Sequence, residues 1–416
     1  MVNLPADFVA ETRRIMGDER FNRFLGAFDE EAPTSVRVNP ARVDSGQWTV
    51  DRYDYPVPWC KEGFYLTERP QFTFDPLLHA GCYYVQEASS MFVTHILRSL
   101  SHLLALSPSN PLAALDACAA PGGKSTAMRS VLPEDCVLVS NEPMGNRAQI
   151  LLENITKWGA PNCIVTNNYP RDFKKAKLKF DVILCDVPCS GEGMFRKDPA
   201  TISEWSMQNV EKCWQLQREI VADAWECLNP GGLFIYSTCT FNTKENEENI
   251  QWILENFDAE VLDIPIDPSW NITGSLLEGF TAPVYRFIPG ITRGEGLFAC
   301  ALRKNGGTEV RGHEGARFDE RKLKGLTILE PPYLRTSVHP KVNIPYQEAL
   351  KYLRGEALVL PPDTPRGIVT ITYKGQPLGP AKNIGNRANN LYPKAWRIKS
   401  THLPSEAPKV LKNVKM

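Results

Sequence analysis

The stretch that decides the fold of this 416-residue chain is Asp116-Ala117-Cys118-Ala119-Ala120-Pro121-Gly122-Gly123-Lys124-Ser125. It follows an apolar segment that predicts a buried strand, and its glycines predict a tight turn into a helix. Its end imitates a P-loop, but that motif needs a glycine where Cys118 stands, and the glycine spacing of a dinucleotide fingerprint is missing. The stretch therefore predicts a turn with exposed backbone N–H groups and a helix N-terminus that favours an anionic group.

Strand-like and helix-like segments alternate around this turn, from about residue 75 to residue 304. Such alternation indicates parallel strands joined by crossover helices, that is, a doubly wound α/β domain. We expect Pro230-Gly231-Gly232 to separate the long helix over 203–227 sharply from the next strand. The expected strands are 112–117, 136–141, 163–166, 182–185, 233–237 and 297–302. The expected helices are 124–131, 146–158, 203–227 and 244–256.

Two smaller modules flank this domain. Residues 1–74 combine a helical apolar pattern with a short strand and an aromatic, proline-rich segment, which predicts an α+β module. The composition then changes after residue 304, first to glycines and next to charges, so we expect a linker over 305–325. Residues 326–416 contain short strands and one helical segment, which predicts a small β-rich module. The doubly wound domain over 75–304 lies between these two modules.

The composition is that of an ordinary globular protein, with 43% hydrophobic and 23% charged residues. Residues 1–16 are too charged for an export signal, and no apolar run is long enough to span a bilayer, so we expect a soluble, cytoplasmic protein without a membrane partner. Eleven cysteines in such a chain favour reduced thiols over disulfides. They show no C-x-x-C spacing and the six histidines are scattered, so we expect no metal site.

Charge is unevenly distributed although the net charge is only -1. From residue 382 to residue 416 there are eight lysines and arginines against one glutamate, an excess of seven positive charges. A second basic stretch covers residues 171–179. Each stretch is either a solvated face or a surface that contacts the phosphates of a nucleic acid.

Two cysteines stand in turns that follow expected strands, in Asp186-Val187-Pro188-Cys189 and in Ser237-Thr238-Cys239. The C-terminal ends of parallel strands meet at one edge of a sheet, so we expect both thiols beside the glycine turn. A free cysteine is most often a small core residue, and Cys213, Cys227 and Cys300 fit that description. Packing alone does not explain the turn positions of Cys189 and Cys239.

Two thiols beside an adenosyl cofactor suit methyl transfer to a pyrimidine carbon. Carbon C5 of cytosine is a poor nucleophile, so an enzyme first adds a thiolate at C6, and after methyl transfer C5 loses its proton and the enzyme is eliminated. A second group must help with proton removal or release, and Cys239 and Cys189 fit these two roles. Asp186 either bonds the N3 and N4 edge of the base or caps its turn, and Lys124 can assist nearby.

A cofactor site is expected beside the glycine turn. S-adenosylmethionine offers a carboxylate to the helix N-terminus that follows the turn. The second expected strand ends in Asn141-Glu142-Pro143, where the acidic residue either accepts hydrogen bonds from both ribose hydroxyls or is a solvated charge or helix cap. Asn168, just beyond the third strand, is a candidate for the adenine side.

These motifs resemble those of the RNA cytosine-5 methyltransferase family that is related to the NOL/NOP/Sun proteins. The opening stretch looks like its cofactor loop, residues 186–193 like its Pro-Cys motif, and residues 237–240 like its Thr-Cys motif. Arg37-Val38-Asn39-Pro40 and Gln86-Glu87-Ala88-Ser89-Ser90-Met91 also look like family signatures. The resemblance covers about residues 37–304 and implies a Rossmann-like S-adenosylmethionine methyltransferase domain.

The resemblance also implies roles for individual residues. It makes Cys239 the nucleophile and Cys189 the residue that assists release, whereas DNA cytosine-5 enzymes attack with the Pro-Cys thiol. The cofactor pocket that it implies is lined by Cys118, Ala119, Ala120, Pro121, Gly122, Gly123, Lys124, Glu142 and Asp186. The chain departs from the family at two places: Asn168 or its neighbour stands where an acidic residue often contacts the adenine side, and Gly290 stands where many relatives have histidine.

Residues near the C-terminus resemble the tail of the bacterial small-subunit ribosomal RNA methyltransferase F class. The matching runs are Tyr373-Lys374-Gly375-Gln376-Pro377-Leu378-Gly379 and Tyr392-Pro393-Lys394-Ala395-Trp396-Arg397-Ile398. Such tails look like PUA-type RNA-binding modules, and this one coincides with the basic stretch. The resemblance implies methylation of cytosine C5 in 16S ribosomal RNA, within the small subunit or its precursor, with residues 1–74 as an RNA-recognition module. The same reaction on tRNA and a non-catalytic RNA-binding assembly factor are the alternatives.

Overall fold

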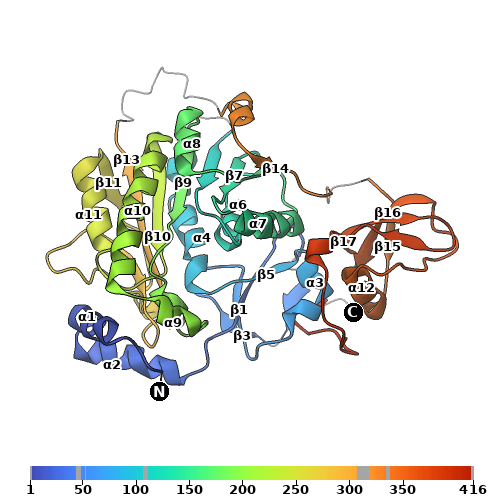
Figure 1. Cartoon of the computed structure of the whole chain (residues 1–416), viewed down its shortest axis with the longest axis horizontal. Coiled ribbons are helices and arrows are strands. Elements are labelled where there is room, and N and C mark those ends of the chain that lie inside the picture. The colour runs from blue at the N-terminus through green and yellow to red at the C-terminus, as the bar shows by residue number, and fades with distance from the viewer. Residues whose placement is uncertain are drawn as a thin grey trace.

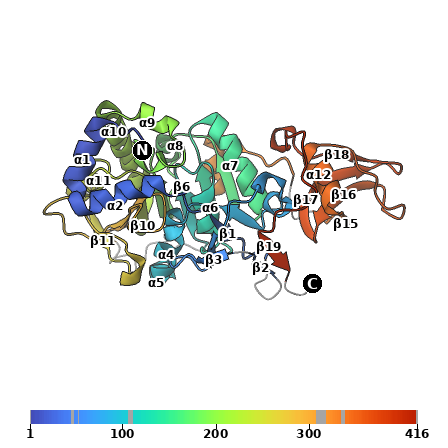
Figure 2. The same ribbon diagram turned by 90° about the horizontal axis from the view of Figure 1, so that it is seen from below.

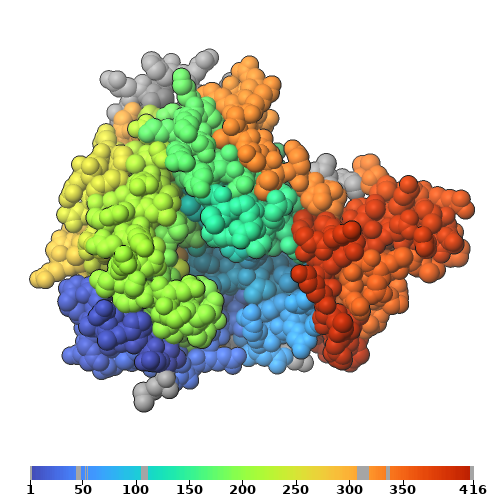
Figure 3. Space-filling view, viewed as in Figure 1, coloured from blue at the N-terminus to red at the C-terminus, as the bar shows by residue number. Residues whose placement is uncertain are grey.

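The fold is given by a computed structural model, which describes residues 2–43, 48–51, 53–105, 111–306, 318–333 and 338–413 (Figure 1). A large α/β domain forms the middle of the molecule, and the N-terminal helices lie against it (Figures 1 and 2). The C-terminal module forms a separate lobe at one end of the long axis (Figure 3). No helix within these ranges has the length and apolar character needed to cross a membrane.

The central sheet confirms the expected doubly wound fold. Its strand order is β11-β13-β10-β9-β6-β7-β8-β14, with β12 paired to β13. Five neighbouring strands are parallel, and their chain order reverses between β6 and β9, which is a topological switch point. The parallel strands are β6 (Ala113–Asp116), β7 (Val137–Asn141), β8 (Cys163–Thr166), β9 (Phe180–Asp186) and β10 (Leu228–Thr238). β13 (Leu297–Lys304) pairs antiparallel with β10, β11 (Ala259–Leu262) and β12 (Tyr285–Phe287), and β14 (Ile328–Leu329) pairs antiparallel with β8.

Helices cover both faces of this sheet, which is why its inner strands are almost continuously apolar. Along β9, Val182 and Leu184 pack in the core on one face, and Ile183 and Cys185 pack in the core on the other. The helices are α4 (Phe92–Ser99), α5 (Ser101–Ala105), α6 (Gly123–Arg129), α7 (Gly145–Trp158), α8 (Pro170–Lys175), α9 (Ala200–Glu204), α10 (Met207–Glu226) and α11 (Glu247–Asn256). Short 3₁₀ turns are η3 (Ser89–Met91), η4 (Glu192–Met194), η5 (Pro268–Trp270) and η6 (Glu320–Gly325).

Three details differ from the prediction. The single helix expected over 203–227 is wrong, because Ser206 caps α10 by accepting a hydrogen bond from the Asn209 N–H at 3.1 Å and so separates it from α9. Pro230-Gly231-Gly232 lies within β10, where it shifts the register against β9 instead of ending the element. β13 runs antiparallel to β10, because the chain enters β13 at the edge of the sheet where β10 ends. Phe298 near the start of β13 therefore pairs with Thr238 at the end of β10.

The N-terminal helices pack on the loops that follow β9 and β10. They are α1 (Ala6–Met16) and α2 (Asp18–Gly26), followed by η1 (Ala27–Asp29). The Phe8 ring lies 5.1 Å from that of Phe195, and the Phe24 ring lies 5.1 Å from that of Phe241. These edge-to-face contacts join the front of the chain to the loops that carry the two candidate cysteines.

The backbone around Gly290 leaves no room for a side chain. The backbone of Gly290 itself is left-handed, with φ +79°, and a Cβ there would overlap the carbonyl oxygen of Arg23 in α2. The Arg23 guanidinium in turn donates to the Gly290 carbonyl at 3.2 Å. The close approach of α2 therefore excludes any side chain at position 290.

A second sheet of the molecule, called the N-terminal sheet below, has the strand order β3-β4-β1-β5 and extends beyond residue 74. Its strands are β1 (Ser35–Val38), β3 (Tyr53–Pro56), β4 (Gly63–Leu66) and β5 (Tyr83–Val85), with η2 (Phe72–Phe74) and α3 (Pro76–His79) between β4 and β5. Of the linker expected over 305–325, residues 307–317 lie outside the described residues, and Leu323 is buried against the central sheet.

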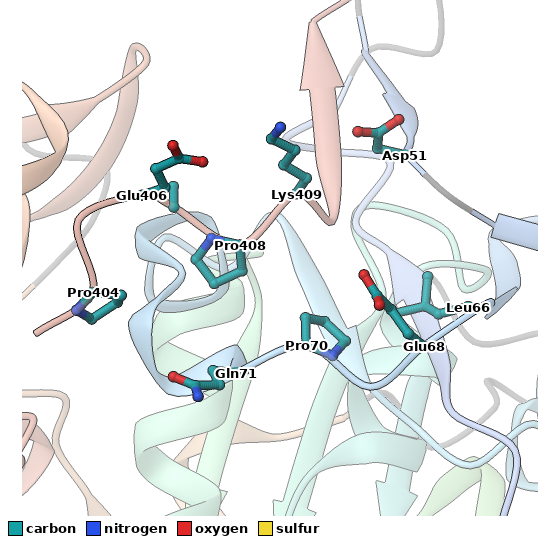
Figure 4. Close-up of a pocket in the computed structure, with 10 residues that line it drawn as sticks. Asp51, Leu66, Glu68, Pro70, Gln71, Pro404, Glu406, Pro408 and Lys409 are labelled. Atoms are coloured by element: carbon teal, nitrogen blue, oxygen red, sulfur yellow. The ribbon is translucent and has the colours of Figure 1, made fainter.

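The C-terminal module shares a buried hydrophobic core with the N-terminal sheet. Val36 and Leu77 belong to the same buried cluster as Leu350 and Ile371. The module consists of β15 (Lys341–Asn343), α12 (Tyr346–Arg354), β16 (Gly367–Tyr373), β17 (Gln376–Asn383), β18 (Ala388–Asn390) and η7 (Lys394–Trp396). Its last segment, β19 (Leu411–Asn413), returns to pair with β2 (Trp48–Val50), and a cleft of about 400 Å³ lies where the tail passes β4 (Figure 4).

Candidate active site at the switch point

Three parallel strands end side by side at the switch point. β6 ends at Asp116, β9 ends at Asp186 and β10 ends at Thr238. Asp116 pairs with Leu184 of β9, and Asp186 pairs with Ser237 of β10. Because neighbouring parallel strands end at the same edge, the loops that follow them open towards a common site.

The two candidate cysteines meet at this edge. The Sγ atoms of Cys189 and Cys239 lie 3.3 Å apart, and both side chains are partly exposed. The hydrogen bond to Cys239 raises the pKa of Cys189 well above its ordinary value, and burial raises it further. Cys189 is therefore a neutral thiol near pH 7 and is suited to donate its S–H to the Cys239 sulfur. By contrast, Cys227 and Cys300 are buried in the core as expected, while Cys213 is only partly buried.

A charged chain of side chains lies next to the thiols. Lys124 Nζ donates to Asp186 Oδ2 at 2.8 Å, and Ser237 Oγ donates to Asp186 Oδ1 at 2.8 Å. Burial acts to lower the pKa of Lys124, but the negative charge of Asp186 and its hydrogen bond to the lysine outweigh burial, so the pKa is raised. The lysine is thus a permanent cation at this edge of the sheet.

The cofactor loop is a tight turn with its own support. Gly122 adopts φ +112°, which favours glycine, and a Cβ there would lie 3.2 Å from the Leu151 side chain. Ser125 Oγ donates to Asp116 Oδ2 at 2.6 Å, while Asp116 Oδ1 is buried without a hydrogen bond from any described residue. Burial raises the pKa of Asp116 to about 7. Burial likewise raises the pKa of the Cys118 thiol, which makes Cys118 a wall of the loop rather than a nucleophile.

A buried arginine from the N-terminal sheet supports this loop through hydrogen bonds to backbone carbonyl oxygens. Arg37 is completely buried, and its guanidinium donates to the carbonyl oxygens of Gly123 and Thr126 at 3.3 Å each. It also donates to Gln86 Oε1 at 2.8 Å and lies over the Trp158 ring, 4.6 Å from its centroid. The first turn of α6 is therefore tied to both motifs, 37–40 and 86–91, that looked like family signatures.

Glu142, the residue expected at the ribose, lies just beyond the end of β7. Its carboxylate is 1% exposed. Oε1 accepts from the Met144 N–H at 3.0 Å, whereas Oε2 has no hydrogen bond from any described residue and lies 3.3 Å from Arg147 Nη1. An unsatisfied buried oxygen of this kind suits a ligand hydroxyl. Asn168 is placed differently, because both polar atoms of its amide bond the backbone of Thr327, at 3.0 Å each.

Family models match the chain in three consecutive ranges. "N-terminal domain of 16S rRNA methyltransferase RsmF" matches residues 4–88, "16S rRNA methyltransferase RsmB/F" matches residues 103–303, and "Methyltransferase RsmF PUA domain" matches residues 339–398. The chain belongs to the RsmB/F methyltransferase family. This confirms the resemblance to the Sun-related methyltransferases and to the F class.

Curated relatives carry the name ribosomal RNA small subunit methyltransferase F. The protein from Pectobacterium atrosepticum is 35% identical in an alignment of length 319, which covers 73% of this chain and 63% of the relative. The protein from Enterobacter sp. is 29% identical in an alignment of length 472, gaps included, which covers 94% of this chain and 96% of the relative. The more identical matches thus span less than two thirds of the relatives' own length.

Solved structures share the RsmB/F fold. A methyltransferase homolog protein from Pyrococcus horikoshii matches with a TM-score of 0.57 and 29% identity, over 73% of this chain and 96% of its own. NSun6 from Pyrococcus horikoshii, solved with SFG, also has a TM-score of 0.57, at 20% identity over 72% of this chain and 98% of its own. The second match shows the fold alone.

Within the RsmB/F domain, the structure brings most of the candidate residues to one edge of the central sheet. It also shows supporting residues that sequence reasoning did not predict. Lys124, Asp186, Cys189 and Cys239 lie together, while Asn168 is occupied by Thr327. Sequence reasoning missed the Arg37 support, and it missed two buried glutamates in the cysteine loops, Glu192 and Glu245. Their signal was a single acidic residue in each cysteine loop, several residues beyond the end of an apolar strand. Among the described residues, no group of His, Cys, Asp and Glu is arranged to hold a metal ion.

Proposed function

We propose that this chain methylates carbon C5 of cytosine in RNA, with 16S ribosomal RNA as the substrate and S-adenosylmethionine as the methyl donor. The observation that carries the proposal is the 3.3 Å separation of the Cys189 and Cys239 sulfurs at the switch point. Two thiols in contact suit a reaction in which one sulfur bonds to the base and the other takes part in its release. The names of the curated relatives support ribosomal RNA as the substrate.

Cys239 is the proposed nucleophile, and its sulfur adds to C6 of the cytosine so that C5 becomes enamine-like. Cys189 is the weaker candidate for this step, because its raised pKa keeps it a neutral thiol. Lys124 stabilises negative charge beside the attacking sulfur. Cys189 then assists the elimination that frees Cys239 after C5 has lost its proton.

Asp186 is proposed to hold the Watson–Crick edge of the base. Its two oxygens already accept from Lys124 and Ser237, at 2.8 Å each, which fixes the orientation of the carboxylate. An ionised carboxylate has about four lone-pair sites, so it can also accept from the N4 amino group of the cytosine. The carboxylate therefore orients the ring while Cys239 attacks it.

The adenosyl group is proposed to lie between the cofactor loop and Glu142. Glu142 Oε2, buried and without a hydrogen bond from the described residues, accepts from the ribose. Residues 118–124 turn their backbone towards the amino-acid end. When bound here, S-adenosylmethionine supplies an electrophilic methyl group. Asn168 forms a wall of this pocket whose amide is held by Thr327.

The flanking modules are proposed to bind the RNA. The target base must leave its stack to reach Cys239, so a helix end, a bulge or a partly assembled particle is the expected substrate. Exposed basic residues of the C-terminal module supply phosphate contacts, among them Lys382, Arg387, Lys394 and Lys399. Lys415 of the same basic stretch lies outside the described residues.

RNA bisulfite sequencing of strains with and without this protein tests the proposal. Loss of a 5-methylcytosine signal from 16S ribosomal RNA is the expected result. Loss of a signal from tRNA instead would support the same reaction on the other substrate. An unchanged pattern would overturn the enzymatic proposal and favour a non-catalytic assembly factor.

A further inference from the structure

Two buried carboxylates lie in the loops that carry the cysteines. The Cys189 loop, residues 187–195, follows β9, and the Cys239 loop, residues 239–246, follows β10. Glu192 lies in the first loop and Glu245 in the second, and their side chains are 2% and 0% exposed. A carboxylate is costly to bury unless hydrogen-bond donors surround it, so the donors around these two glutamates are informative.

Each carboxylate binds the backbone of the opposite loop. Glu192 Oε2 accepts from the N–H of Phe241 at 2.6 Å and from that of Asn242 at 3.1 Å. Glu245 Oε2 accepts from the N–H of Ser190 at 3.0 Å. The exchange is reciprocal: one carboxylate fixes the chain just after Cys239, and the other fixes the residue directly after Cys189.

A single amide joins the two carboxylates. Asn242 Nδ2 donates to Glu192 Oε1 at 3.0 Å and to Glu245 Oε1 at 2.8 Å. Gln217 of α10 donates to Glu245 Oε2 at 2.7 Å and to the Pro188 carbonyl at 2.9 Å. We call Glu192, Asn242 and Glu245 the carboxylate brace. Networks in which every member has a partner give a unique, rigid geometry.

The loops also touch directly. The Gly193 N–H donates to the Cys239 carbonyl at 2.7 Å, and a Cβ on Gly193 would overlap that oxygen. The hydroxyls of Ser190 and Thr240 lie 2.9 Å apart. The backbones therefore approach as closely as they can, and the carboxylate brace closes the remaining polar contacts between them.

We propose that Glu192 and Glu245 are positioning residues that hold the sulfurs of Cys189 and Cys239 in register for nucleophilic addition and release. The catalytic part rests on the proposed function, whereas the loop geometry does not. Glutamine has the size of glutamate but turns an NH₂ group towards donors that need an acceptor. Glu245→Gln therefore loosens Ser190 and displaces Cys189, while Glu192→Gln loosens the chain after Cys239.

Cross-linking of the two thiols in the full-length protein tests the geometry without turnover. Diamide takes two electrons and two protons from a pair of thiols, forms the S–S bond and becomes a hydrazine. Peptide mapping then gives the rate for the Cys189–Cys239 bond. We expect each glutamine variant to slow this rate about tenfold.

Asp181→Asn is the matched control, because Asp181 is also buried and accepts the Ala113 N–H at 2.9 Å, but at the other end of β9. It should leave the rate unchanged. Equal slowing by Asp181→Asn, or no slowing by the glutamine variants, would overturn the proposal. Where a glutamine variant does not fold, Thr240→Val removes one hydroxyl of the Ser190 contact and should slow the bond about threefold.

Trapping of the protein–RNA adduct on denaturing gels, with 16S ribosomal RNA as the probe, separates the two roles. Glu245→Gln should accumulate adduct as Cys189→Ala does, and Glu192→Gln should form less adduct than the unchanged protein. If no variant, Cys189→Ala included, gives an adduct while cross-linking still slows, the proposed function fails and the brace stands. If Cys189→Ala gives the adduct but the glutamine variants behave like the unchanged protein in both assays, the brace fails and the function stands.

Discussion

At one edge of the central sheet, the cysteine loops are held by two buried carboxylates, whereas the cofactor loop is held by one buried guanidinium. The carboxylate brace uses groups that the two loops themselves supply. Arg37 instead comes from the N-terminal sheet, 86 residues before the Gly123 carbonyl that it binds. The contrast teaches that thiol contact is set within the methyltransferase domain, while the shape of the cofactor loop depends on a second module.

Replacing the cysteines should have the largest effect. Cys239→Ala removes the attacking sulfur and should lower turnover by at least about 10³-fold. Cys189→Ala leaves addition possible but impairs release, so a protein–RNA adduct should persist in denaturing gels. An adduct with Cys239→Ala instead would show that the two roles are reversed.

Arg37→Met should weaken the support of the cofactor loop and leave the cysteine loops unchanged. It removes the hydrogen bonds that the buried guanidinium donates to the carbonyl oxygens of Gly123 and Thr126 and to Gln86 Oε1, so the unfolding free energy should fall by about 3–5 kcal/mol. The KM for S-adenosylmethionine should rise, while the diamide cross-link of the thiols should form at the normal rate. Arg129→Met is the control, because Arg129 is also buried and donates to the Cys136 and Leu132 carbonyls away from the loop. That variant should lose stability without a matching rise in KM.

Glu245 of the carboxylate brace should make the free energy of unfolding fall as the pH rises. Burial, followed by the charge of Glu192, raises the pKa of Glu245 from 4.5 to about 7. The folded protein therefore holds this proton more tightly, and the resulting stability is complete below pH 4.5 and is lost as the pH rises through 7. The contribution is about 3 kcal/mol. Urea unfolding at several pH values should show that Glu245→Gln lacks this part of the slope, and an identical slope in both proteins would contradict the prediction.

Glu142→Gln should have the smallest effect of the four. The amide still accepts one hydrogen bond but loses the charge that favours two ribose hydroxyls, so the KM for S-adenosylmethionine should rise about tenfold, or about 1.4 kcal/mol. Glu153→Gln on α7, the helix that follows Glu142, serves as the control, since Glu153 pairs with Lys157. Equal KM values for the two variants would remove Glu142 from the cofactor site.

Much of the fold could be predicted because the apolar strands are continuous and end at recognisable turns. The expected ends of β6, β9 and β10 were enough to place Cys118, Asp186, Cys189 and Cys239 along one edge. A periodic pattern does not record strand direction, so the antiparallel β13 was missed. The capping role of Ser206 was missed because a serine within a helical pattern looks like any exposed polar residue.

The supports of the site were less predictable for a physical reason. A buried charge is defined by its partners, and those of Arg37 lie 49 to 93 residues away along the chain. The pattern around Glu192 and Glu245 is polar and reads as a solvated loop, although both side chains are buried. Long-range hydrogen bonds of this kind leave no periodic trace in a sequence.

The pairing of β19 with β2 has a mechanical consequence. The C-terminal lobe is fastened on its entry side by β14, which pairs with β8, and on its exit side by β19. Because the lobe also shares a buried hydrophobic core with the N-terminal sheet, these two pairings add to an interface that already opposes independent motion of the lobe. If both flanking modules bind RNA as proposed, they would therefore do so as one unit, with a fixed spacing between their two contacts on the RNA.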